Sequence, residues 1–281
     1  MSRTTVLAGF ALTLAAGAAD AAGAQGDGSF LRDRRAGIRT SIFATYVRSG
    51  ELLVHPFFEA YRDKDKAYTP SEFGFAGSTE FTGKYRASEG LLFIAYGIND
   101  RVALEIEAAA IDATLEKSPS DGSAMPSKVQ ESGPGDMQVQ FDFRLLHETE
   151  KRPEVFAFFE TVFPSNTSKP LIGTPDFEYK AGGGLIRGTS VGTFTTRAAI
   201  QYVDGAVEAG EWAVEYLRRF SPRWRMYAGV EGTQGEVELI GELQWQPRPR
   251  IFFRFNCGYG LTASATDLAP DVGIVFSRLL R

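Results

Sequence analysis

Hydrophobic and polar residues alternate strictly over several long segments of the chain. Apolar residues fill every second position from Met137 to Leu145, and Gln140, Asp142 and Arg144 stand between them. Neighbouring side chains of a β-strand point to opposite faces, so this pattern predicts a strand with one apolar and one polar face. Helical spacing is absent from these segments. The same alternation recurs at 102–108, 224–231, 237–246 and 251–259.

The full pattern predicts about twelve strands. Most are longer than the usual strand and reach the roughly nine to eleven residues that cross a bilayer at a tilt. The predicted strands are 51–62, 81–98, 101–113, 135–147, 153–164, 176–188, 192–204, 208–221, 223–232, 236–247, 250–262 and 270–280.

The connections between these strands alternate between short turns and long polar loops. The long ones fall at 63–80, 114–134, 165–175 and 263–269, whereas 205–207 and 233–235 are short where the pattern requires length. Short turns on one side and long loops on the other are typical of outer-membrane barrels. The sequence therefore predicts an all-β, transmembrane, antiparallel up-and-down β-barrel. A soluble β-sandwich, which needs the same alternation, is the alternative fold.

Aromatic residues gather near both ends of the predicted strands. Two aromatic girdles at the membrane interfaces of a barrel have this distribution. Aromatic residues in the core of a β-sandwich could have the same distribution. Those near the short turns are Phe143, Phe220, Trp224 and Trp245, and those near the long loops are Phe163, Tyr179, Tyr202, Trp212 and Tyr259.

Residues 1–24 have the features of a cleaved signal peptide. Arg3 provides a positive start, 6–19 is apolar but too short to span a membrane, and 22–24 offers small residues for cleavage. Residues 25–50 are expected to form a periplasmic lead or a segment in the lumen, and 51–281 the barrel. No later apolar run reaches the roughly 18 residues of a membrane helix, so any membrane-spanning part must consist of strands.

Charge narrows the function classes. The net charge of −5 is mild and both signs are dispersed, so nucleic-acid binding is not expected. If the apolar faces contact lipid, the polar faces line a charged lumen, which is either a solute-selecting pore or closed by ion pairs. The lumen-facing candidates are Glu59, Glu105, Glu107, Asp142, Arg144, Glu160, Lys180, Arg197, Glu215, Arg225, Glu242 and Arg254.

Some apolar residues also fall on the predicted inner faces. They could guide a hydrophobic or aromatic solute, or they could pack against residues 25–50. These residues are Leu53, Phe57, Tyr61, Phe156 and Phe158.

Catalytic chemistry is not indicated. The two histidines, His55 and His147, are both predicted at the short-turn end and have no metal-ligand companions at usable spacing. The single Cys257 cannot form a disulfide within the chain. No metal, cofactor or enzyme activity is expected, although a lipid-modifying barrel enzyme remains a third hypothesis.

Several motifs resemble a family of bacterial outer-membrane barrels named after the meta-pathway of phenol degradation and regarded as transporters. They are Gly133-Pro134-Gly135-Asp136 before an alternating strand, the turn at 97–101, the strand at 51–62 with Pro-Phe-Phe-Glu at 56–59, and the strand end at 159–168. The chain departs from the family's pattern after Phe276, because 277–281 lacks its usual final aromatic residue.

This resemblance implies a barrel in the outer membrane of a Gram-negative bacterium. With the charged lumen, it favours a channel or transporter for small solutes, hydrophobic or aromatic ones among them. A closed structural barrel of the envelope is the main alternative. The expected partners are outer-membrane lipid and lipopolysaccharide, the outer-membrane assembly machinery and a small-molecule solute.

Overall fold

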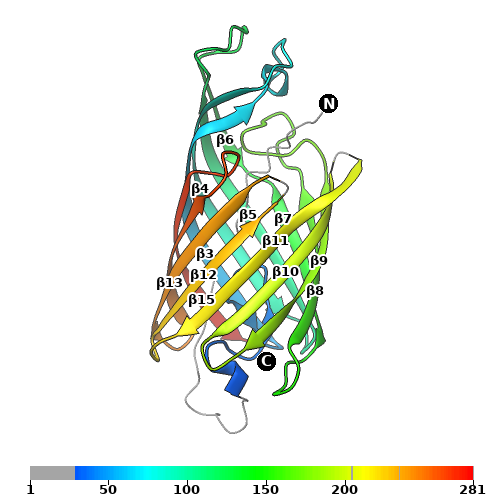
Figure 1. Cartoon of the computed structure of the whole chain (residues 1–281), viewed down its shortest axis with the longest axis vertical. Coiled ribbons are helices and arrows are strands. Elements are labelled where there is room, and N and C mark those ends of the chain that lie inside the picture. The colour runs from blue at the N-terminus through cyan, green and yellow to red at the C-terminus, as the bar shows by residue number, and fades with distance from the viewer. Residues whose placement is uncertain (1–28, 204, 234, 281) are drawn as a thin grey trace.

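A computed structural model of the chain describes residues 29–203, 205–233 and 235–280 (Figure 1). The predicted signal peptide lies outside these residues. Within them, strands form one closed antiparallel sheet, in which the last strand β15 pairs with the first long strand β3. No helix in the described part of the chain is both long and apolar enough to cross a membrane.

The barrel wall has twelve positions in the described residues, because β6 and β7 share one of them. Both strands pair with β5, at successive heights, and the break between them is at Gly135 and Asp136. The strands are β3 (Glu51–Tyr68), β4 (Phe81–Gly97), β5 (Val102–Glu116), β6 (Lys128–Pro134), β7 (Met137–Leu146), β8 (Glu154–Phe163), β9 (Glu178–Gly188), β10 (Thr193–Val203), β11 (Ala206–Arg219), β12 (Trp224–Gly232), β13 (Val237–Arg248), β14 (Ile251–Gly260) and β15 (Leu268–Leu279).

The predicted all-β, twelve-stranded fold is therefore confirmed, and most strand bounds agree within about two residues. Two expectations about length were wrong. The first strand continues to Tyr68, and the expected loop 114–134 contains the end of β5 and all of β6. Both hairpins rise above the rest of the rim at the long-loop end, at the top of Figure 1. Gly133 and Pro134 suggested a loop, but Pro134 ends β6 at the break and disturbs no later pairing.

Large apolar side chains cover the outside of the barrel. Outward positions such as Phe141, Leu239 and Val272 are 38–47% exposed, whereas the alternating inward positions are buried. A wall with this exposed apolar belt needs lipid around it, because water would have to solvate the whole belt. The barrel is thus a transmembrane one, as predicted.

Two aromatic groups flank the belt on the outer face. Near the short turns, Trp245 stacks between Trp224 and Phe253, with ring centroids 6.0 and 5.5 Å apart. Near the long loops, the ring of Tyr179 stacks on the ring of Phe159, with the two centroids 6.4 Å apart. Two aromatic groups at the two ends of the strands agree with the predicted interfacial girdles.

Candidate functional site

Residues 29–50 lie inside the barrel at its short-turn end and are called the lumen segment below. In Figure 1 this segment is blue and lies at the bottom, near the C-terminus. It contains a short 3-10 helix η1 (Ser29–Leu31) and a small hairpin in which β1 (Ile38–Arg39) pairs with β2 (Tyr46–Val47). Its apolar residues are almost fully buried: Ile38, Ile42, Phe43 and Val47 are each no more than 1% exposed.

Three arginines of the lumen segment pair with carboxylates of the wall. Arg34 lies 2.7 Å from Glu148 and 3.2 Å from Glu154. Arg35 lies 2.6 Å from Glu51. All of these side chains are less than a tenth exposed. Separating a buried pair would leave a charge without a partner in the interior, which costs free energy, so these pairs hold the lumen segment in one position against the wall.

The third arginine, Arg39, lies 2.6 Å from Glu215 on β11. Its guanidinium also lies 5.2 Å from the centre of the Phe156 ring. Tyr46 adjoins Arg34 and Arg39, but burial raises the pKa of this phenol more than the two arginines lower it. Tyr46 therefore stays neutral, and the wall carboxylates are the counter-ions of the arginines.

Aromatic contacts complete the fit of the lumen segment. Phe43 stacks on Tyr227 of β12 with ring centroids 4.9 Å apart, and the guanidinium of Arg197 lies 5.3 Å from the Phe43 ring centre. On another wall, the backbone N–H of Ser41 donates to Glu105 Oε2 at 2.8 Å. The lumen segment therefore contacts β3, β5, β8, β10, β11 and β12 of the wall at this end of the lumen.

The predicted inner apolar residues are all buried within the barrel. Leu53 and Phe57 belong to the same apolar cluster as Ile42 of the lumen segment, and Phe156 clusters with Tyr46. Of the two alternatives for these residues, packing against the N-terminal segment is the one that the contacts support.

Glycines on β9 make room for two of these rings. A Cβ added to Gly184 would lie 2.7 Å from the Phe156 ring, and one added to Gly182 would lie 2.5 Å from the Phe158 ring. The Gly182–Gly184 run thus permits the close approach from inside that glycine in a strand often signals.

Many charged residues of β7 to β15 form ion pairs along the lumen wall. Arg197 lies 3.1 Å from Glu215 and 2.8 Å from Glu231, and it also pairs with Glu211. Other pairs neutralise the neighbouring carboxylates. They are Lys180 with Glu160 at 3.0 Å, Arg144 with Glu154 at 3.3 Å, and Arg254 with Asp271 at 3.3 Å and with Glu242.

The structure places the twelve predicted lumen-facing residues on the inner face. Ten are buried to 8% exposure or less, and Lys180 and Arg197 are half-buried. Arg225 differs from the other basic residues of this set in that no carboxylate oxygen lies within 4.0 Å of it among the described residues.

Several carboxylates on β3 to β5 are not neutralised in this way, and three of them are buried glutamates. Glu59, Glu89 and Glu107 are 4%, 2% and 4% exposed, and none lies within 4.0 Å of a basic nitrogen in the described residues. Neither carboxylate oxygen of Glu107 has a hydrogen-bond partner there, and Oε2 of Glu89 also lacks one. These three residues are called the acidic row. Glu89 was missed from the sequence, because both faces of its strand are apolar from Leu91 onward and the inward face is ambiguous.

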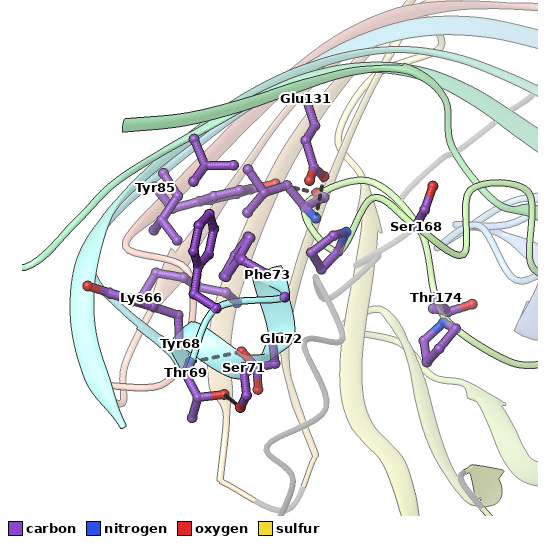
Figure 2. Close-up of a pocket in the computed structure, with 18 of the residues that line it drawn as sticks. Lys66, Tyr68, Thr69, Ser71, Glu72, Phe73, Tyr85, Glu131, Ser168 and Thr174 are labelled. Carbon is purple, nitrogen blue, oxygen red and sulfur yellow. Dashed lines mark hydrogen bonds between the residues drawn. The ribbon is translucent and has the colours of Figure 1, made fainter. Parts of the chain in front are cut away.

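The long-loop end contains a cavity of about 780 Å³, called the vestibule below (Figure 2). Its walls come from β3, β4, β5, β6, the 3-10 helix η2 (Pro70–Phe73) and the loop after β8. Rings and aliphatic side chains alternate with charged groups on these walls. The lining includes Lys66, Tyr68, Glu72, Phe73, Phe75, Tyr85, Leu115, Lys128, Val129, Glu131, Leu171, Asp176 and Glu178.

The loop 164–177 is fixed against the vestibule wall by hydrogen bonds. The backbone N–H of Leu171 donates to Glu131 Oε2 at 2.8 Å, and the Tyr85 hydroxyl donates to the Leu171 carbonyl at 3.4 Å (Figure 2). Lys169 Nζ donates to the Ser132 carbonyl of β6 at 2.6 Å. These hydrogen bonds hold the loop 164–177 against β4 and β6, where it forms part of the vestibule wall.

The two histidines do not form a catalytic pair with any described serine. His55 is 1% exposed, lies beside Phe57 with ring centroids 4.6 Å apart, and has no hydrogen-bond partner on either nitrogen. His147 is exposed in a short turn. In the described residues no group of three or more His, Cys, Asp or Glu side chains could hold a metal ion.

The barrel is similar to that of solved outer-membrane proteins. An outer membrane channel from Pseudomonas putida F1 matches with a TM-score of 0.61 and 12% identity, over 83% of this chain and 97% of that chain. The translocator domain of the autotransporter NalP from Neisseria meningitidis matches less well, with a TM-score of 0.47 and 11% identity over 81% and 88% of the two chains. The toluene transporter TbuX from Ralstonia pickettii has a TM-score of 0.41 and 9% identity, over 83% and 90%.

Only the first of these likenesses is strong enough in shape to bear on the fold. It confirms the outer-membrane type of barrel that the sequence motifs suggested. No protein-family model matches the chain, and no curated protein matches it.

Proposed function

We propose that the protein is a plugged channel in the outer membrane of a Gram-negative bacterium. In this proposal the vestibule faces outward and takes up small solutes with an apolar or aromatic body, and the lumen segment closes the periplasmic end. The observation that carries it is the contrast between a cavity of about 780 Å³ at one end of the lumen and a buried chain segment that lies in the lumen at the other. Ligand sites of this size are concave and largely apolar, with a few polar groups.

The outward direction of the vestibule follows from the loops. Outer-membrane barrels place their long loops outside and their short turns in the periplasm. The similar outer membrane channel from Pseudomonas putida supports a transport role in this fold. A transport role also favours a protein without enzyme activity.

Single-channel recording tests the proposal. The protein from residue 25 onward is refolded in detergent and added to planar bilayers, alone and as the variant Arg34→Gln/Arg35→Gln/Arg39→Gln. We expect brief or no openings from the unchanged protein and sustained steps from the variant, because the substitutions remove the charges that anchor the lumen segment. The variant Arg62→Gln/Arg86→Gln/Arg223→Gln, in which all three arginines are exposed, is the matched control and should behave like the unchanged protein.

A correctly folded anchor variant that never conducts would contradict the channel and support the closed structural barrel. Heat-dependent mobility in detergent gels establishes that the barrel has folded before this outcome is interpreted.

A further inference from the structure

The acidic row lies between the vestibule and the lumen segment. On β5, Leu115 lines the vestibule, Glu105 accepts a hydrogen bond from the lumen segment, and Glu107 is the next inward residue above Glu105. On β4, Tyr85 lines the vestibule and Glu89 follows two inward positions below it. A solute that leaves the vestibule towards the periplasm therefore meets these carboxylates before it meets the lumen segment.

The carboxylates are also neighbours across the strands. Glu59 on β3 is directly opposite Glu89 on β4, and on its other side it is opposite Asp271 on β15. Asp271 pairs with Arg254 at 3.3 Å and accepts a hydrogen bond from Asn256 at 2.6 Å. Like charges directly opposite each other destabilise a sheet. Unlike Asp271, the three carboxylates of the acidic row have no guanidinium nitrogen within 4.0 Å among the described residues.

The three unbonded carboxylate oxygens, both of Glu107 and Oε2 of Glu89, have no partner among the described residues and point to an external partner. An ionised carboxylate that is more than nine-tenths buried and unpaired raises the free energy of the folded protein, because the protein interior solvates charge poorly. Ionisable residues at membrane depth that face an interior cavity commonly mark solute pathways, and rings of Asp and Glu select cations. The neighbouring basic residues Arg197, Lys180 and Arg254 are already paired with carboxylates of their own wall.

The vestibule adds an aromatic surface for a cation. The ammonium of Lys66 lies 5.9 Å from the centre of the Tyr85 ring, so this ring already contacts one cation, which belongs to the protein itself. Figure 2 shows Tyr85 among the other side chains of the vestibule, with Tyr68 and Phe73 also on the wall. Aromatic faces together with carboxylates are the groups that recognise organic ammonium ions.

We propose that the acidic row, together with the Tyr85 face, makes this pathway selective for small organic cations: an ammonium group carried on an apolar or aromatic body. This inference rests on the proposed channel function and specifies its substrate class. The carboxylates are not grouped closely enough to hold a metal ion in the described residues, so an extended organic cation fits the row better than a bare metal.

Two measurements test the inference. The first is binding of benzyltrimethylammonium, benzyl alcohol and benzoate to the intact protein in detergent, followed by calorimetry. We expect the cation to bind best and to lose about tenfold in affinity, equivalent to 1.4 kcal/mol, in the variant Glu59→Gln/Glu89→Gln/Glu107→Gln. Its matched control, Asp112→Asn/Glu116→Gln/Glu208→Gln, neutralises three exposed carboxylates and should bind like the unchanged protein.

The second measurement is the reversal potential of the anchor variant across a KCl gradient. We expect it to report cation preference, and we expect that preference to vanish when the three glutamines of the acidic-row variant are added. Equal binding of the cation, the alcohol and benzoate, or unchanged cation preference in the glutamine variant, would overturn the inference.

The two proposals fail differently. An anchor variant that stays silent while the intact protein binds the cation through the row contradicts the channel and keeps the cation site. Gln has nearly the shape of Glu, so we expect the glutamine variant to fold, and heat-dependent gel mobility checks this. A triple Glu→Asp variant that keeps the cation preference would show that the negative charge is its cause.

Discussion

The two sides of the lumen wall differ in whether their buried charged side chains form ion pairs. On β8 to β14, basic residues such as Arg197 and Arg254 pair with the carboxylates beside them. On β3 to β5, Glu59, Glu89 and Glu107 have no basic partner among the described residues. Because both sides line the same lumen, the difference separates charges that stabilise the barrel from charges left available to a solute.

The largest expected effect comes from removing a basic residue on β8 to β14, where the buried charges are paired. Arg197→Gln removes the basic partner that lies 2.8 Å from Glu231 and one of the two basic partners of Glu215, which keeps Arg39. We expect the free energy of unfolding, measured with urea in lipid vesicles, to fall by about 3–5 kcal/mol. Arg86→Gln on the exposed face is the control, and a loss there of similar size would show that the effect is not specific to the paired side.

The second largest effect concerns which side holds the lumen segment. Phe43 stacks on Tyr227 and lies under Arg197, whereas the hydroxyl of Ser41 donates a hydrogen bond to Glu105 Oε2 near the acidic row. We expect Phe43→Ala to weaken docking of the segment by about 3 kcal/mol, and Ser41→Ala by about 1 kcal/mol. Hydrogen exchange of the lumen segment measures both, and equal losses would mean that the two sides hold it alike.

The sequence alone predicted the side on which most charges lie but not how they pair. Alternation is local, so Asp142 and Arg144 could be assigned to the lumen from their neighbours. The contact between Arg39 and Glu215 joins residues 176 positions apart and depends on how the sheet closes. That closure is a property of the whole barrel, which local periodicity does not contain.

The lumen segment was uncertain for a related reason. Its arginines Arg34, Arg35 and Arg39 look like a solvated run, since isolated charges seldom enter a protein interior. They are buried here because carboxylates from three parts of the wall meet them. The choice between a lead and an internal segment therefore required the positions of those carboxylates in space.

A substitution on the unpaired side should change stability in the other direction. Glu107→Gln removes a buried charge that has no hydrogen-bond partner among the described residues, so we expect the free energy of unfolding to stay the same or rise by about 1 kcal/mol. Urea unfolding in the same vesicles allows direct comparison with Arg197→Gln. A clear loss of stability would mean that Glu107 has a structural partner, and the two sides would then be alike.

The smallest expected effect tests how far the cation-accepting surface extends into the vestibule. Tyr85 has an aromatic face within 5.9 Å of Lys66 Nζ, and its hydroxyl makes one long hydrogen bond of 3.4 Å to Leu171. Tyr85→Phe keeps the ring, so binding of benzyltrimethylammonium should hardly change. Tyr85→Leu removes the ring but keeps an apolar side chain, and affinity should fall about threefold, as the loss of an exposed cation–π contact predicts. If both variants bind alike, the ring does not contribute, and recognition of the cation rests on the three carboxylates below it.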